Sequence, residues 1–147
     1  MLEDRGITGI ARARIDQALR KLVRPAVHGE RAPLEVAAHH VRGEPIAAEE
    51  AYRRDYEPFA VGRPWGGAWD TTWFRMRGRI PQAWAGAEVV ALLDLGGLGM
   101  VGFTAEGLVW QGDVPVQGIH LRHREHLLTR SAAGGEPVEL YVEAAAN

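Results

Sequence analysis

The sequence predicts an all-β, antiparallel sandwich preceded by one N-terminal α-helix. Three observations predict this class. One segment near the N-terminus repeats its apolar residues with a helical period. The rest of the chain contains short segments that alternate apolar and polar residues with a period of two. Glycine, proline and aspartate interrupt these segments at short intervals, as is typical of antiparallel sandwiches.

Length and composition limit the classes of protein to consider. The chain has 147 residues, of which 46% are hydrophobic and 24% charged, enough for one domain with a real core. A net charge of −2 predicts no nucleic-acid partner and no attraction to a membrane. Without cysteine there is no disulfide or thiolate chemistry, and any metal ligand must be His, Asp or Glu. The N-terminus lacks the continuous apolar core of a signal peptide, so we expect a cytoplasmic protein.

The expected helix covers residues 8–24. Its apolar residues recur at helical spacing: Ile15, Leu19, Leu22 and Val23. Thr8 is the expected N-cap, and Pro25 is expected to stop the helix. The other face is polar, which is typical of a helix on a surface. We therefore expect residues 1–25 to form an amphipathic helix packed on a sandwich of residues 26–147.

Short strands are expected to follow the helix. Residues 33–41 form a plausible first strand, and residues 46–54 are expected to make one or two helical turns. A loop rich in proline and glycine then leads to a strand that begins at Thr71 and ends before Pro81.

The strand that begins at Thr71 has two unlike faces. One face is mostly apolar and consists of Thr72, Phe74, Met76, Gly78 and Ile80. The other consists of Thr71, Trp73, Arg75, Arg77 and Arg79. A face with one tryptophan and three arginines is unlike a core. We therefore expect this face to be solvated or covered by something polar.

Three further segments complete the predicted sandwich. Residues 88–95 are apolar on both faces, which predicts a central buried strand. Residues 103–118 predict a hairpin, with turn signals at Glu106–Gly107 and at Gly112–Asp113. The last segment, residues 137–147, alternates again. Its apolar residues are Val138, Leu140 and Val142, and they alternate with Glu139, Tyr141 and Glu143.

Tryptophans gather before and at the start of the strand at Thr71. Trp65, Trp69 and Trp73 lie four residues apart, but the intervening glycines and the period-two pattern disfavour a helix. We expect the three rings to cluster, partly exposed, at one edge of the sandwich. With Asp70 and Arg75 they form the candidate contact site, either for carbohydrate or for another domain. A plain role in the core stays open as the alternative.

Histidines supply the next candidate site. The stretch HLRHREH contains His120, His123 and His126, and three histidines are a common ligand set for zinc. Strand spacing turns His123 away from the other two, and helical spacing separates the first ring from the third. We therefore expect a solvated or interface loop here and no metal site. His39 and His40 are adjacent, so they point to opposite faces of a strand and predict no site.

Acid/base catalysis needs two carboxylates that converge in a cleft. The sequence does not show such convergence for any of its candidates, which are Asp70, Asp94, Glu106 and Asp113. Asp94 ends a strand and is expected to accept backbone N–H bonds in a turn. Ser131 has no nucleophile-elbow pattern around it. We therefore predict no catalytic residue and no cofactor within this chain.

Several motifs, taken in order, give the chain a resemblance to a known family. They are WGGAWDTTWFRMRGRIPQAWAGAEVVALLDLG, GFTAEGLVWQGDVPVQGIH and LYVEAAAN. The series resembles the N-terminal, non-catalytic domain of glycoside hydrolase family 38 α-mannosidases over residues 25–147. More loosely, it is similar to the sugar-binding domain of family 2 glycosidases. The resemblance implies a jelly-roll-like (galactose-binding-like) sandwich, in agreement with the strand pattern.

The resemblance also implies that this chain is one domain of a longer enzyme. Those α-mannosidases hydrolyse α-mannosides with an Asp nucleophile and a zinc ion, both in a catalytic domain outside the matched part. We expect this chain to be non-catalytic and to pack against that catalytic domain. An α-mannoside and further copies of the chain are additional expected partners. The alternative is a stand-alone carbohydrate-binding module that uses the tryptophan-rich edge.

Overall fold

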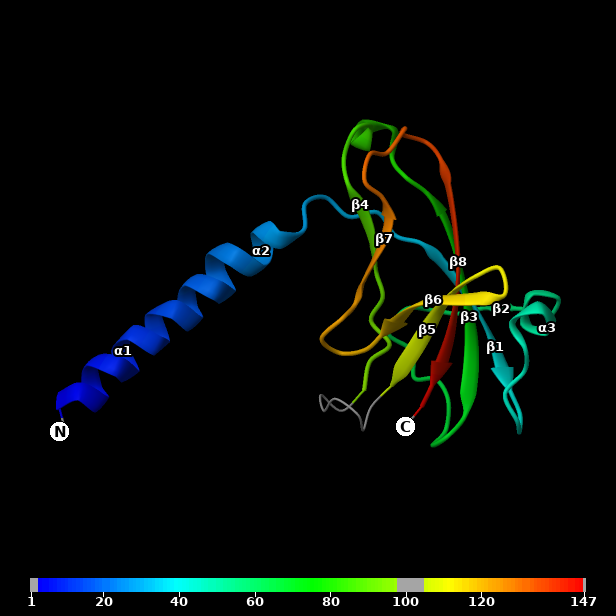
Figure 1. The fold of residues 1–147 in the computed structure, drawn as a ribbon, viewed down its shortest axis with the longest axis horizontal. Helices are drawn as coiled ribbons and strands as arrows, with labels where there is room; N and C mark the ends of the chain where they lie inside the picture. Colours follow the sequence, from blue (N-terminus) through cyan, green and yellow to red (C-terminus); the bar gives the residue numbers. More distant parts are fainter. Residues whose placement is uncertain (1–2, 98–104, 147) are drawn as a thin grey trace. The chain divides into compact units, whose positions relative to one another are not determined.

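The computed structural model describes residues 3–97 and 105–146, which fall into two compact units (Figure 1). The first unit is Met1–Ala32 and the second is Pro33–Asn147. The division agrees with the predicted order of one helix followed by a sandwich.

The first unit is helical from residue 3 to residue 27. It consists of α1 (Glu3–Ala18), a π-helical turn (Leu19–Val23) and α2 (Arg24–Val27). The predicted helix is confirmed, but both predicted ends are wrong. Thr8 is not the N-cap, because the helix already begins at Glu3. Pro25 does not end the helix. It lies in the first turn of α2, directly after the wider π-helical turn, and a residue without an N–H is tolerated in a first turn.

The helical unit forms no core with the side chains described from Thr8 to Ala32. Its described side chains from Thr8 to Ala32 are exposed, apart from a partly exposed His28. Among the described residues, no helix is long and apolar enough to cross a membrane. The packing of this helix on the sandwich stays a prediction.

The second unit is built on a six-stranded antiparallel sheet with the strand order β2-β1-β3-β8-β5-β6 (Figure 1). Its strands are β1 (Glu35–Val41), β2 (Glu57–Pro58), β3 (Thr71–Arg79), β5 (Glu106–Gln111), β6 (Val114–Ile119) and β8 (Pro137–Ala145). The long central pair β3–β8 runs from Thr71 opposite Ala145 to Arg79 opposite Pro137. The strands predicted within residues 33–41, from Thr71 and from residue 137 are confirmed, although the first begins only at Glu35.

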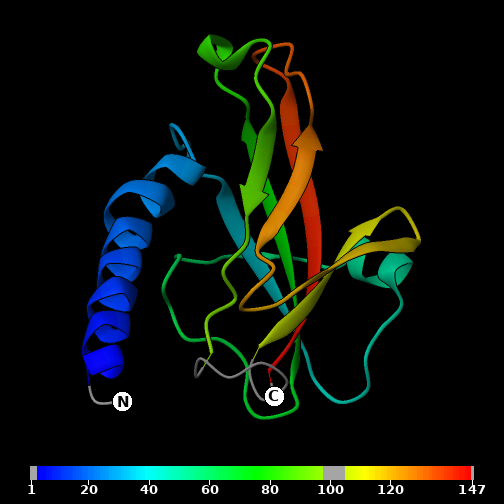
Figure 2. The ribbon, with the colours of Figure 1, turned by 60° about the vertical axis from the view of Figure 1, so that its left-hand side comes forward.

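A second sheet of two antiparallel strands, β4 (Val89–Leu92) and β7 (Glu125–Thr129), covers one face of the large sheet (Figure 2). The main core lies between the two sheets. Its buried residues include Phe74, Met76, Val89, Ala91, Val109, Ile119, Val138, Leu140 and Val142. The expectation of an antiparallel β-sandwich with one N-terminal helix is confirmed.

The prediction of a central buried strand at residues 88–95 is wrong in its position. β4 belongs to the small sheet, and its burial alternates along the strand. Val89 and Ala91 face the core, whereas Leu92 remains 40% exposed on the outer face. The apolar outer face of a two-stranded layer therefore produced the same pattern as a strand covered on both sides.

Two predictions about turns have different outcomes. The hairpin between β5 and β6 turns at Gly112–Asp113, as predicted. Glu106–Gly107 is not a turn, because β5 begins there and pairs with β8. Gly107 is needed for close packing instead. A Cβ at this position would lie 3.0 Å from the carbonyl oxygen of Glu143 and 2.8 Å from Leu95 Cδ1.

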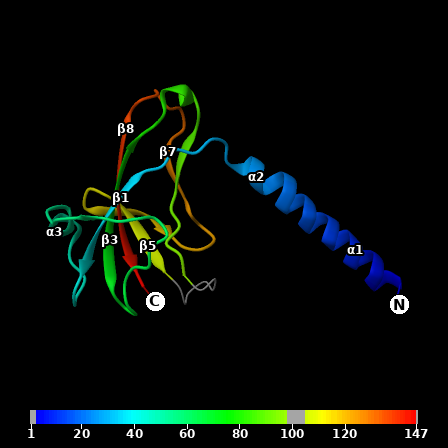
Figure 3. The same cartoon turned by 180° about the vertical axis from the view of Figure 1, so that it is seen from behind.

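A short helix, α3 (Ala48–Tyr52), packs on the face of the large sheet that points away from the small sheet (Figure 3). It confirms the helical turns expected within residues 46–54. Its buried residues Ala48 and Ala51 join Val41 and Trp73 in a second core. The large sheet is therefore covered on both faces, by the small sheet on one side and by α3 on the other.

A single 3₁₀ turn (Gln82–Trp84) follows β3.

Candidate functional site

The loop that enters β3 is fixed by a compact set of backbone hydrogen bonds. Asp70 closes a turn, since its N–H donates to the Gly67 carbonyl oxygen over 3.0 Å. Its Oδ2 in turn accepts the N–H of Gly67 over 2.7 Å. On the other side, the N–H of Trp69 donates to the Ala146 oxygen over 2.6 Å, and the Ala146 N–H donates to the Asp70 oxygen over 3.0 Å. The loop is thus tied to the residue that follows β8.

Trp65 is half-buried and belongs to the main core. Its indole N–H donates to the carbonyl oxygen of Leu95 over 2.9 Å. Its ring meets the ring of Phe74 edge to face, with centroids 5.3 Å apart and planes at 89°. Both the polar atom and one side of the ring are therefore used by the fold, and Trp65 serves mainly to hold the loop against the sandwich.

Trp69 is the exposed member of the predicted group, with 83% of its surface accessible. Its backbone adopts φ = 69°, the left-handed region that glycine prefers. For a bulky residue this conformation costs about 1–3 kcal/mol, which the surrounding hydrogen bonds must offset. The backbone conformation of Trp69 is therefore unfavourable, and its ring makes few contacts with its own domain.

Trp73 contradicts the prediction of a shared, partly exposed edge. Its side chain is 0% exposed and lies in the second core. Tyr52 meets its ring edge to face with centroids 6.1 Å apart, and the Trp110 ring centroid lies 5.7 Å away. Since Trp65 packs in the main core instead, the three rings do not cluster. The error arose because α3 and its flanking tyrosines cover a sheet face that the arginines made look solvated.

The Trp73 indole N–H has no hydrogen-bond partner among the described residues. A buried polar group without a partner carries a desolvation cost.

Arg75 lies beside this second core and not in a contact site with Trp69. Its guanidinium carbon lies 4.8 Å from the centroid of the Tyr56 ring, a cation–π arrangement. Tyr56 in turn donates its hydroxyl to the Ala51 oxygen over 3.2 Å, and burial raises the pKa of this phenol. Arg75 is thus covered by an aromatic ring and not by a polar group, whereas the solvation expected for this face is found at the exposed Arg77 and Arg79.

The other two arginines of this face are exposed and paired. Arg77 bonds the Glu139 carboxylate across the β3–β8 pair over 2.5 Å, and Arg79 donates to the Gly135 oxygen over 2.9 Å. The three arginines of this face therefore each make a separate structural contact.

Glu143 is a half-buried carboxylate that the sequence pattern did not single out. It lies opposite Trp73 in the β3–β8 pair. Its Oε2 accepts the Trp110 indole N–H over 3.0 Å. Burial raises the pKa of Glu143, while the hydrogen bond from Trp110 opposes part of that rise. The available signal was its place on the same sheet face as Trp73.

The predicted histidine loop forms a small bridge and a polar link between the sheets. His120 and His123 exchange backbone hydrogen bonds of 3.0 and 2.9 Å. Gln117 of β6 lies between two rings, with its Oε1 2.9 Å from His126 Nδ1 and its Nε2 3.3 Å from His123 Nε2. Burial lowers the pKa of His126. Within residues 3–97 and 105–146, no group of three or more His, Asp or Glu side chains is arranged to hold a metal ion.

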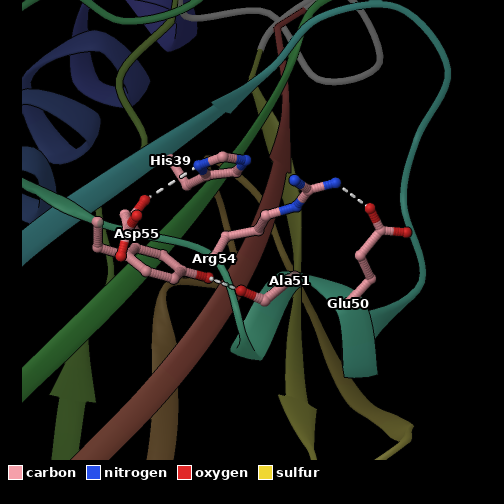
Figure 4. A network of polar contacts seen from close by, with 6 residues as sticks. His39, Glu50, Ala51, Arg54 and Asp55 are labelled. Atoms are coloured by element: carbon pink, nitrogen blue, oxygen red, sulfur yellow. Dashed lines mark hydrogen bonds and ion pairs between the residues drawn. The ribbon is translucent and has the colours of Figure 1, made fainter.

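The remaining candidate residues take part in local structure. Asp94 accepts the Gly96 N–H over 3.0 Å, which confirms its turn role, and it also pairs with Arg124 over 2.7 Å. His40 Nδ1 lies 2.8 Å from Thr72 Oγ1. On the opposite face, His39 Nδ1 lies 3.1 Å from the Asp55 oxygen, beside the ion pair between Glu50 of α3 and Arg54, which follows α3 (Figure 4). The adjacent histidines therefore diverge, as predicted.

The fold and these contacts define a class of protein, a small antiparallel β-sandwich domain of the jelly-roll kind. The chain belongs to the family described as alpha-mannosidase, jelly roll domain, whose model matches residues 32–147. The resemblance to the N-terminal domain of α-mannosidases is thereby confirmed.

Two curated relatives show how small a part of a longer protein this domain is. Human alpha-mannosidase 2C1 is 34% identical over 129 residues, which is 85% of this chain and 12% of the human protein. Alpha-mannosidase G of Dictyostelium discoideum is 26% identical over 110 residues, or 71% of this chain and 9% of that protein. The chain therefore spans only about an eighth or less of the relatives it matches.

Proposed function

We propose that this chain is a non-catalytic accessory domain of an α-mannosidase that packs against the catalytic part of the same polypeptide. The observation that carries the proposal is the fixed end of β8. Ala146, directly after this strand, exchanges hydrogen bonds with Trp69 and Asp70 of the loop that enters β3. These bonds fix the direction in which a following segment would leave the domain. A domain that positions its neighbour needs such a fixed exit direction.

The use of the carboxylates supports this role. Glycoside hydrolysis needs two carboxyl groups that flank a bond. Here Asp70 binds Gly67, Asp94 binds Gly96 and Arg124, and Glu143 binds Trp110. Each of these acids stabilises a turn or a strand pair. Zinc, which the resemblance implies for such enzymes, would bind in the catalytic part.

The proposal is tested by comparing this chain with the longer α-mannosidase polypeptide that contains the domain. Both are assayed with a nitrophenyl α-mannoside at matched molar concentrations. We expect hydrolysis by the longer polypeptide and none by the 147-residue chain. Turnover by the short chain that purifies with it would overturn the proposal, as would equal hydrogen exchange of the domain's amides in both forms, since packing must protect some of them.

A second candidate function is carbohydrate binding, and the exposed ring of Trp69 is the observation that favours it. Aromatic rings stack on sugar faces, but recognition also needs polar groups directed at the hydroxyls. The carboxylate of the adjacent Asp70 bonds Gly67 through Oδ2, and neither Trp65 nor Trp73 offers a second ring beside Trp69. Titration with mannose oligosaccharides, followed by tryptophan fluorescence, is expected to give no saturable quenching.

A further inference from the structure

Trp69 stands out for its backbone conformation as well as for its exposure. Among residues 3–97 and 105–146 it is the one non-glycine residue with a positive φ. An unfavourable conformation persists only where the surrounding structure enforces it, and such positions concentrate at functional sites. The 83% exposed indole gains little from its own domain in return. Packing within the described part of the domain therefore does not explain why a tryptophan occupies this position.

The surrounding residues fix the backbone of Trp69. Its backbone N–H donates to the Ala146 oxygen, and the next residue, Asp70, accepts the Ala146 N–H through its carbonyl and the Gly67 N–H through its carboxylate. Gly66 lies close on the other side, since a Cβ there would be 3.0 Å from Ala146 Cβ. The ring therefore projects from a loop whose backbone is tied to both β3 and β8. A preorganised backbone loses little freedom when the loop binds a partner.

We infer that the Trp69 indole is the anchor by which this domain docks on the catalytic part of the α-mannosidase polypeptide, inserting into an apolar pocket there. The inference rests on the proposed function and names the residue that carries it. Large aromatic side chains that enter a partner's pocket dominate interface energies. Trp65 and Trp73 are committed to the two cores, so Trp69 is the ring of the predicted group that is free to dock.

The position of Trp69 and its surroundings point to the partner on which the ring docks. The backbone N–H of Trp69 donates to the carbonyl oxygen of Ala146, so Trp69 lies next to the end of β8. In the relatives, about nine-tenths of the polypeptide lies outside this domain, so a large neighbouring part is covalently attached to it. A tethered neighbour is present at a high effective concentration. Trp65 and Trp73 pack elsewhere and the Asp70 carboxylate bonds Gly67, which disfavours a sugar, as described above.

The decisive variant is Trp69→Gly, made both in this chain and in the longer α-mannosidase polypeptide. In this chain, glycine adopts the positive φ without strain, and the substitution removes little packing. The midpoint of thermal unfolding is therefore expected to rise or stay unchanged. In the longer polypeptide the same change removes the anchor. There, limited proteolysis between this domain and the remainder is expected to accelerate at least about thirtyfold, the factor that corresponds to truncating an interface hot spot.

Val61→Ser is the matched control. Val61 lies in the same loop region and is 85% exposed, but its φ is not positive. We expect this variant to leave both the unfolding midpoint of the short chain and the proteolysis rate of the longer polypeptide unchanged.

The possible results separate this inference from the proposed function. Unchanged proteolysis in the Trp69→Gly polypeptide would overturn the anchor, even where hydrogen exchange still shows that the domain is packed. Saturable quenching of Trp69 fluorescence by mannose oligosaccharides, lost in Trp69→Gly, would overturn it in favour of a sugar site. An unpacked domain in the unmodified polypeptide would overturn the proposed function itself.

Discussion

Trp110 donates its indole N–H to the Glu143 carboxylate over 3.0 Å, and this bond joins β5 to β8 beside the buried ring of Trp73. The carboxylate is half-buried, so the bond is formed at the expense of hydration of a charge. Burial accordingly raises the pKa of Glu143 above its ordinary value of 4.5. The pair stabilises the strand register, but the charge itself opposes folding.

Glu143→Gln is therefore expected to stabilise the chain at neutral pH, by less than about 1 kcal/mol because the group is partly solvated. The amide oxygen still accepts the Trp110 N–H, and no charge is desolvated. In the native protein the raised pKa means that the folded state binds the proton more tightly. The contribution of Glu143 to stability thus falls as pH rises through 4.5 toward the folded pKa, and the variant lacks this fall.

Urea unfolding of the two proteins between pH 4 and pH 8 measures this difference. Glu143→Ala is the useful comparison, since it removes the acceptor and leaves the Trp110 N–H without its partner. A Glu143→Gln protein that is as destabilised as Glu143→Ala would show that the charge strengthens the bond more than burial weakens it.

Local patterns predicted the strands well because their signals lie within each segment. The period-two alternation from Thr71 and the proline at position 81 place β3 without any knowledge of its neighbours. The turn role of Asp94 is equally local, since the N–H of Gly96, which donates to the Asp94 carboxylate, lies only two residues further along the chain. Features of this kind are fixed by adjacent residues.

Burial was harder to predict, because it depends on residues distant in sequence. Trp73 shares its face with Arg75, Arg77 and Arg79, yet it is buried by Ala48 and Ala51 of α3 and by the neighbouring tyrosines. The opposite error occurred at β4, where the apolar Leu92 lies on an outer face. In both cases tertiary covering decided the outcome, and composition of the strand did not reveal it.

Trp73→Ala is expected to destabilise the chain by about 3–5 kcal/mol, the usual cost of removing a buried aromatic ring. Trp73→Phe is expected to cost clearly less, about 1–2 kcal/mol, because it keeps a ring and also removes the indole N–H that has no partner. Urea unfolding at pH 7 measures both values. Equal costs for the two variants would mean that the indole N–H is satisfied in solution, for instance by water.

The link between β6 and β7 predicts a dependence of stability on pH. Burial lowers the pKa of His126 below 6.5 in the folded chain, so the unfolded chain binds the proton more tightly. Stability is therefore expected to fall as pH decreases through 6.5 toward the folded pKa. Gln117 accepts the hydrogen bond from His126 Nδ1 in the neutral ring, and protonation adds a charge to this half-buried contact.

His126→Gln is expected to reduce this fall in stability between pH 7 and pH 5, because a glutamine does not titrate. Thermal unfolding midpoints of both proteins across this range provide the measurement. A parallel decline in the two proteins would assign the pH dependence to other groups.

Gly107 and Gly118 lie on the two strands of one hairpin and are expected to respond in opposite ways to alanine. At Gly107 a Cβ would approach the Glu143 oxygen to 3.0 Å and Val142 Cγ1 to 3.2 Å. The backbone of β8 would have to shift, so Gly107→Ala is expected to cost about 1–3 kcal/mol. At Gly118 a Cβ would meet nothing within 4 Å, and φ is not positive.

Gly118→Ala is therefore expected to be neutral or to stabilise the chain by up to about 1 kcal/mol, because alanine restricts the unfolded state more than glycine does. Urea unfolding of both variants, with far-UV circular dichroism as the probe, measures the difference. Both substitutions add a methyl group, one in each of two adjacent strands. A loss of stability in both variants would point to the hairpin's flexibility as the cause. Only a loss confined to Gly107 agrees with close packing of β5 on β8 as the reason for glycine at that position.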